Sequence, residues 1–335
     1  MKRALIAGLA ALAIAVPSSV FGWGSTGHRF VGEAAMKSLP GDLPAFLRTP
    51  AAATDVGEYS REPDRTKGSG REHDADRDPG HFLDLSDDGT ALGGPKLSAL
   101  PTTRADYETA LRAVGQDSWK AGYLPYSIVD RWQQLAKDLA YWRVLSAAEA
   151  NPAWKAHRAF FTIDRRRREA QILIAIGELS HFVGDGSQPL HVTVHFNGWG
   201  DFPNPGGYTA AKIHGPFEGD LVFASVTKAG VIARMAPPKD CHCPVQKRVA
   251  DYLAATGALV VPLYQLEKAG GFSPGDPRGP AFATQQIAVG ASELRDLIID
   301  AWKMSATQTV GYKPVSVADV LAGRADPYSA LYGID

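Results

Sequence analysis

The chain has 335 residues, a formal net charge of −1 at pH 7 and a mean hydropathy of −0.15. A protein that holds nucleic acid by charge alone is strongly basic, so this balance excludes that class unless bound metal supplies the positive charge. The only cysteines are Cys241 and Cys243, which excludes a disulfide scaffold. We expect a local disulfide between them; a metal site with His242 and two reduced thiols remain alternatives.

The first residues have the layout of a secretory signal peptide. Lys2 and Arg3 precede an almost wholly apolar run, Ala4 to Val16, which Pro17 ends. The run of about 13 residues is shorter than the roughly 20 that a membrane-spanning helix needs. We therefore predict a signal peptide over 1–22, cleaved after Gly22, and a secreted or periplasmic protein without a stable membrane anchor. We expect no later segment to be long and apolar enough to span.

Apolar residues recur at helical spacing along most of the chain, which predicts a mainly α fold. The sequence predicts helices over 27–39, 104–114, 125–147, 152–162, 166–183, 246–266 and 285–304. Strand signals are few, and 192–196 is the clearest. We expect one compact multi-helix domain over 23–310 and a C-terminal tail over 311–335, loop-like except for 315–323.

Two long segments, 54–103 and 195–213, read as irregular because Asp, Gly, Pro and Arg dominate the first, and Gly, Pro and aromatic residues the second. Loops of this length in a compact domain are usually functional or disordered.

The strongest chemical signal runs from His181 to His191. His181 and Asp185 are four residues apart, so on a helix they share one face. Gly186 and Pro189 then end the helix and turn the chain back, which returns His191 to the same place. Imidazole nitrogen and carboxylate oxygen are the ligands that zinc prefers.

Three further elements carry the same residue types: His214 with Glu218, His81 beside Asp84, and His28. Singly, each has an ordinary explanation, such as a packed core histidine, a surface pair or a solvated acidic loop. Their combination in one secreted chain indicates a multi-metal site.

These pieces resemble the zinc-dependent single-strand-specific nucleases of the S-one/P-one type. That family shares a superfamily with the zinc-dependent bacterial phospholipases C. The matching segments appear in the family's order over about 200 residues: Trp23–His28 (Trp-Gly-Ser-Thr-Gly-His), His81–Asp84 (His-Phe-Leu-Asp), His181–His191 and His214–Glu218.

The resemblance implies three zinc ions in one cleft, surrounded by long loops. His81, His181, Asp185 and an upstream aspartate would hold the first ion. Asp185 would bridge to a second ion, held also by His28 and by the amino and carbonyl groups of Trp23. Because that amine is a ligand only after cleavage, secretion and activation would be linked.

His191, His214 and Glu218 would hold the third ion. The nucleases usually have Asp at the position of Glu218, whereas the phospholipases C usually have Glu. The upstream aspartate is Asp64 or, as the alternative, Asp55. The resemblance makes three acidic residues of the intervening charged stretch weaker candidates: Asp74, Asp76 and Asp78.

Metal chemistry then suggests the mechanism. A hydroxide shared between two zinc ions would attack phosphorus, with Asp185 and Asp64 as the catalytic carboxylates that hold the ions. Phe82 would stack on an unpaired base, or pack inward and orient His81. Asp84 would bind a base edge or orient a metal-bound histidine. Aromatic residues of the second loop would line the cleft or only pin the loop: Trp199, Phe202 and Tyr208.

The leading hypothesis is a zinc-dependent endonuclease, monomeric and secreted, that hydrolyses phosphodiester bonds of single-stranded DNA and RNA. The alternative is a phospholipase C acting on phosphatidylcholine-type lipids. Glu218 favours the alternative, while Trp23–His28 and His81–Asp84 favour the nuclease. A third possibility is a zinc-scavenging or structural protein without turnover.

Overall fold

A computed structural model describes residues 23–332 of the chain. The predicted signal peptide, 1–22, and the last three residues lie outside the described part. The described residues are mostly helical and form one compact domain, which confirms the mainly α prediction.

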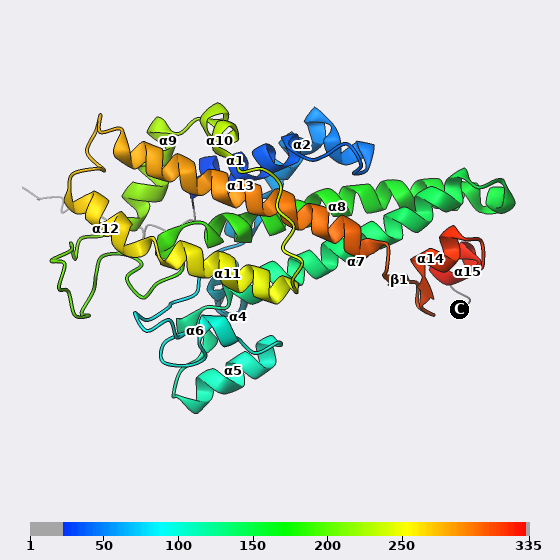
Figure 1. Cartoon of the computed structure of the whole chain (residues 1–335). Helices are drawn as coiled ribbons and strands as arrows, with labels where there is room; N and C mark the ends of the chain where they lie inside the picture. The colour runs from blue at the N-terminus through cyan, green and yellow to red at the C-terminus, as the bar shows by residue number, and fades with distance from the viewer. Residues whose placement is uncertain (1–22, 333–335) are drawn as a thin grey trace, which may run out of the picture.

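Long helices form the centre of the fold (Figure 1). α7 (Leu124–Ala150) and α8 (Arg158–Gly186) lie side by side and α13 (Arg278–Ser305) crosses both. α1 (Gly24–Lys37) and α2 (Pro50–Tyr59) pack on α8. The helix α7 has a proline in its first turn. Proline is tolerated there because backbone N–H groups of the first turn make no hydrogen bond within the helix. One apolar core joins these helices.

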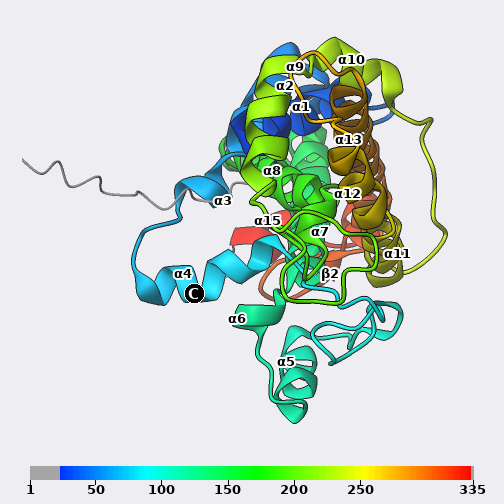
Figure 2. The same cartoon turned by 90° about the vertical axis from the view of Figure 1, so that its left-hand side faces the viewer.

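Shorter helices surround this centre. Figure 2 shows α3 and α4 standing out to one side of the long helices and α5 and α6 at the lower end. Their bounds are α3 Glu62–Arg65, α4 Arg71–Arg77, α5 Arg104–Ala113, α6 Ser118–Ala121, α9 Val222–Ser225, α10 Lys228–Arg234, α11 Val245–Gly257 and α12 Val260–Lys268.

Short 3-10 and π turns connect several of the helices. The 3-10 turns are η1 Ala45–Arg48, η2 Asp78–His81, η3 Leu97–Ala99, η4 Pro152–His157 and η5 Pro189–His191, and η6 Pro216–Leu221 is a π turn.

The predicted strand over 192–196 is wrong. Within 23–332 the only strands are the paired β1 (Thr309–Val310) and β2 (Val315–Ser316). Val192 and Val194 are buried because this irregular segment packs against the loop around Leu85, whose carbonyl accepts a hydrogen bond from the Val194 N–H at 3.0 Å. Residues 192–195 are all buried, so burial here follows from loop packing and does not alternate as in a half-exposed strand.

The chain is divided into helices differently from the prediction at two places. The segments 152–162 and 166–183 do not form separate helices, because η4 leads directly into α8, which is continuous to Gly186. The segment 246–266 is not one helix, because the chain breaks between α11 and α12 at residues 258–259.

The segment 54–103 is less irregular than predicted, since α2, α3 and α4 occupy much of its first part. α4 buries none of its residues, so it has no apolar face for a periodicity argument to detect. Thr49 caps α2 by accepting from the N–H of Ala52, and Pro50 begins the helix.

One helical stretch, Val245–Lys268, is long and apolar enough to cross a membrane by length and composition, contrary to the sequence expectation. It spans the break between α11 and α12. Leu253 and Tyr264 within it are fully buried in the core. In this fold the stretch therefore packs against the protein body.

The C-terminal segment packs against the far end of α7. β1, β2 and α14 (Val317–Leu321) bring three valines onto Ala140 and Val144 of α7, and α15 (Pro327–Tyr332) follows. Elsewhere, Cys241 and Cys243 form the expected local disulfide between α10 and α11.

Candidate metal centre

Buried histidine and carboxylate side chains from distant parts of the chain converge in three clusters that could hold metal ions. In each cluster the candidate ligand atoms lie within 4.8 Å of one another. We call them by their carboxylates: the Asp185 cluster (His28, His181, Asp185), the Asp64 cluster (Asp64, His81, His181) and the Glu218 cluster (His191, His214, Glu218).

The C-terminal end of α8 provides the centre of the arrangement. His181 and Asp185 are one turn apart on this helix, with 3.3 Å between Nε2 and Oδ2. His28 approaches from α1, and its ring passes against Gly184: a Cβ there would lie 2.9 Å from His28 Nδ1. Glycine is therefore required at this position for α1 to bring its histidine to α8.

Asp185 lies between different histidines. Its Oδ1 is 3.5 Å from Nε2 of His28 and 3.8 Å from Nδ1 of His191, while Oδ2 faces His181. The side chain is fully buried, yet neither oxygen has a hydrogen-bond partner among the described residues. A carboxylate placed in this way can bind two ions at once.

Backbone carbonyls orient three of the rings. Nδ1 of His181 lies 2.8 Å from the carbonyl oxygen of Ser60, that of His81 lies 3.0 Å from Asp78 O, and that of His191 lies 2.7 Å from His81 O. Because a carbonyl can only accept, Nδ1 carries a hydrogen, which leaves Nε2 as the nitrogen that can coordinate an ion. This is the usual support of a metal-binding histidine.

Buried polar atoms are normally hydrogen-bonded, and this site departs from that rule. Several buried nitrogen and oxygen atoms of the clusters have no hydrogen-bond partner within the described part of the chain. They are both ring nitrogens of His28, Nδ1 of His214, Nε2 of His81, His181 and His191, and both carboxylate oxygens of Asp185. Such a set fits ions that prefer nitrogen and oxygen ligands.

Of the two upstream aspartates, the structure brings Asp64 to the site. Its Oδ1 lies 3.8 Å from Nε2 of both His81 and His181. Asp55 is exposed on α2 and joins none of the three clusters. Lys67, one turn after Asp64, forms an ion pair with it at 2.6 Å. Nothing in our sequence argument singled out this lysine.

The other early acidic candidates also lie outside the clusters: Asp74, Asp76 and Asp78.

Glu218 reaches its cluster from the π turn η6. Its Oε2 is 2.7 Å from Nε2 of His214 and 3.5 Å from Nε2 of His191. Gln188 is fully buried beside it and donates from Nε2 to the same oxygen at 3.0 Å. The sequence argument missed Gln188, although it lies inside the segment His181–His191, between two of the predicted ligands.

Trp23 precedes α1 and is fully buried. Its indole donates to Oγ of Ser187 at 2.8 Å and its ring packs 5.5 Å from that of Phe217. Trp23 thus holds the start of α1 between the end of α8 and the turn that carries Glu218. Its amine as a ligand stays a prediction, since the clusters above contain side-chain atoms alone.

The surroundings of the histidines shift their pKa values in opposite directions. Burial, reinforced by the other nearby positive charges, lowers the pKa of His28 to about 4 and that of His81 to about 3, so both rings are neutral and able to coordinate. Burial acts in the same direction on His191, but Asp185 and Glu218 outweigh it and raise the pKa of His191 to about 9. A cation is therefore favoured beside these carboxylates.

The predicted substrate residues lie next to the clusters. Phe82 is half-buried, and its backbone lies against Gly122. Any other residue at position 122 would place its Cβ 2.1 Å from the Phe82 carbonyl oxygen, and Gly122 also has a φ of +71°. Burial raises the pKa of Asp84 to about 8, so its carboxyl can donate as well as accept at neutral pH. Trp199 is buried against the rings of His195 and Tyr208, which supports the alternative that this side chain holds its loop in place.

Comparisons with known proteins add no relative: a scan against protein-family models gives no match, and neither does a search of curated proteins.

Proposed function

We propose that the protein is a secreted, zinc-dependent phosphodiesterase that cleaves single-stranded DNA and RNA. The observation that carries this proposal is the convergence of three clusters in which most of the buried ligand atoms make no hydrogen bond to any described residue. The segments that resemble the single-strand-specific nucleases contribute all of these ligands except Asp64, the upstream aspartate.

The residues have separate tasks in this proposal. Zinc bound here would lower the pKa of a coordinated water to about 7 and offset the charge of a phosphodiester. Asp185 would hold two ions at a fixed spacing, and Asp64 would complete one of their ligand sets. Phe82 would stack on an unpaired base, while Asp84, with its raised pKa, would hydrogen-bond the base edge.

A phospholipase C acting on phosphatidylcholine is the second candidate, and Glu218 favours it, since that superfamily branch usually has Glu there. A metal-holding protein without turnover is the third. Both would use the same three clusters.

One experiment separates the three. Mature protein beginning at Trp23 is loaded with zinc and incubated with single-stranded DNA, RNA or phosphatidylcholine vesicles. We expect cleavage of both nucleic acids and little lipid hydrolysis. Hydrolysis of phosphatidylcholine alone would establish the phospholipase, and stoichiometric zinc without any hydrolysis would establish the metal-holding protein.

A further inference from the structure

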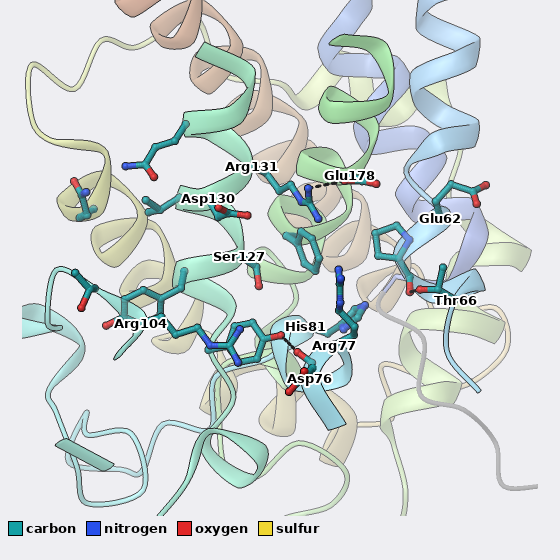
Figure 3. Close-up of a pocket in the computed structure, with 18 of the residues that line it drawn as sticks. Glu62, Thr66, Asp76, Arg77, His81, Arg104, Ser127, Asp130, Arg131 and Glu178 are labelled. Atoms are coloured by element: carbon teal, nitrogen blue, oxygen red, sulfur yellow. Dashed lines mark hydrogen bonds and ion pairs between the residues drawn. The ribbon is translucent and has the colours of Figure 1, made fainter. Parts of the chain in front are cut away.

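A cavity of about 1000 Å³ adjoins the metal clusters on one side of His81 (Figure 3). His81 is the one member of the three clusters that lines it. α3 and α4 form one wall, and α7 with the start of α5 forms the other. Ligand cavities usually measure about 300–1000 Å³, so this space can take at least one nucleotide-sized group.

The guanidinium groups that line the cavity differ in their partners. Arg131 pairs with Glu178 at 3.1 Å, and Arg104 donates from Nε to Glu108 at 2.9 Å. Arg77 forms no ion pair with any residue of 23–332 and is exposed at the end of α4. Its five N–H donors are thus available to an anion.

Figure 3 places Arg104 on one side of the cavity and Glu62 on the opposite side, with Arg77 and His81 between them. The guanidinium of Arg104 lies over the ring of Tyr123, with 3.6 Å from its central carbon to the ring centroid. Nucleobases stack on guanidinium planes and aromatic rings in proteins that bind single strands.

The other residues that line the cavity disfavour two other kinds of ligand, a polyphosphate and a lipid chain. Acidic side chains such as Asp130 and Glu178 balance the arginines, which disfavours a compact polyphosphate. Charged and hydroxyl groups are spread along the walls, so a lipid chain would leave them desolvated without partners. A nucleotide unit offers what fits: a flat ring, hydrogen-bonding edges and one phosphate.

We propose that this cavity binds a nucleotide of the single-stranded substrate beyond the one at the metal clusters. Arg77 contacts its phosphate and Arg104 stacks on its base. This inference rests on the proposed function, and it makes a long strand a better substrate than a dinucleotide.

The test compares Arg77→Gln with wild type on a thymidine dinucleotide and a thymidine octanucleotide. We expect kcat/KM for the octanucleotide to fall about tenfold, mainly through KM, because binding of the distal phosphate is lost. The dinucleotide has one phosphodiester, which lies at the metal clusters and leaves no second phosphate for Arg77, so it should be cleaved at the wild-type rate. Arg71→Gln is the matched control, since Arg71 is also exposed on α4 but does not line the cavity.

Equal loss on both substrates, or no loss on either, would overturn the inference while leaving the nuclease function intact. A separate titration with fluorescently labelled octathymidylate covers the case of a protein that cleaves neither substrate. The wild-type protein should bind it about tenfold more tightly than Arg77→Gln does. Indistinguishable binding by the two proteins, or none by either, would reject the subsite directly.

Discussion

Gln188 donates a hydrogen bond from Nε2 to Oε2 of Glu218 across 3.0 Å, and both side chains are buried. Its own Oε1 accepts from the N–H of Leu190 at 2.9 Å, so the amide cannot turn over without losing both contacts. The amide therefore fixes which oxygen of Glu218 is held and where it points relative to His191 and His214.

We expect Gln188→Leu to lower zinc affinity at the Glu218 cluster by about 10–100-fold, the usual effect of losing a supporting hydrogen bond behind a metal ligand. Competition with a chromophoric chelator measures this directly. Gln286→Leu serves as the control, because Gln286 is comparably buried on α13 but belongs to none of the clusters. Unchanged zinc affinity in Gln188→Leu would show that Glu218 needs no such support.

Asp185→Asn tests the bridging carboxylate. An amide nitrogen cannot coordinate, so one of the two ions would lose its shared ligand. Activity should therefore fall by more than the 10–100-fold that a supporting hydrogen bond costs, and the number of zinc ions per chain should decrease. Asp164→Asn, on the same helix but outside the clusters, should behave as wild type. Full zinc and full turnover in Asp185→Asn would remove Asp185 from the bridge.

Local spacing predicted the part of the site that lies on one helix. His181 and Asp185 meet because residues four apart share a helical face, and the turn at Gly186 returns His191. The contact of Asp64 with His181 could not be predicted in this way, since nothing in the polar segment 54–103 fixes how α3 approaches α8. α4 was missed for a related reason: a helix that buries no residue leaves no periodic pattern.

The choice between Asp64 and Asp55 also needed the fold. Both lie in the same charged segment, and counting residues back to His81 does not separate them decisively. The packing of the chain separates them. Asp55 is exposed to solvent on α2, whereas the turn after α2 brings Asp64 within 3.8 Å of His81 and His181.

Zinc removal should destabilise the folded protein, because the unpartnered ligand atoms are buried at a cost that a bound ion offsets. Zinc at 1,000 times its Kd adds about 4 kcal/mol to the free energy of unfolding, which raises Tm by roughly 6 °C. Thermal melts of chelated and zinc-loaded protein measure this. Magnesium should not substitute, since it prefers oxygen ligands. Identical melting of the chelated and loaded forms would argue against the metal centre.

Glu218→Asp distinguishes the two candidate substrates. Shortening the side chain withdraws its oxygen from His191 and His214 by about one bond length, roughly 1.5 Å. If Glu218 simply replaces the aspartate of the nucleases, the turn η6 should adjust and nuclease activity should stay within about tenfold, which is about 1.4 kcal/mol in the barrier. Cleavage of phosphatidylcholine by the unmodified protein, with single-stranded DNA left intact, would instead identify Glu218 as a phospholipase feature.

The mature N-terminus gives the sharpest prediction. A free α-amine has a pKa near 8, so zinc can displace its proton at neutral pH, and the amine and carbonyl of one residue can chelate an ion together. Trp23 is suitably placed, because its buried indole anchors to Ser187 and α1 then carries His28 to the same region. One extra glycine before Trp23 should therefore displace the ion by removing the amine while leaving the indole in place.

Trp23→Phe is the matched variant, since it keeps the amine and removes the indole N–H. It should bind nearly normal zinc and lose about 1 kcal/mol of stability with the hydrogen bond to Ser187. The measurements are zinc per chain and hydrolysis rate for the processed protein, the glycine-extended protein and Trp23→Phe. If the extended protein matches the processed one in both zinc and rate, the amine is no ligand and Trp23 acts only through packing on Phe217 and Ser187.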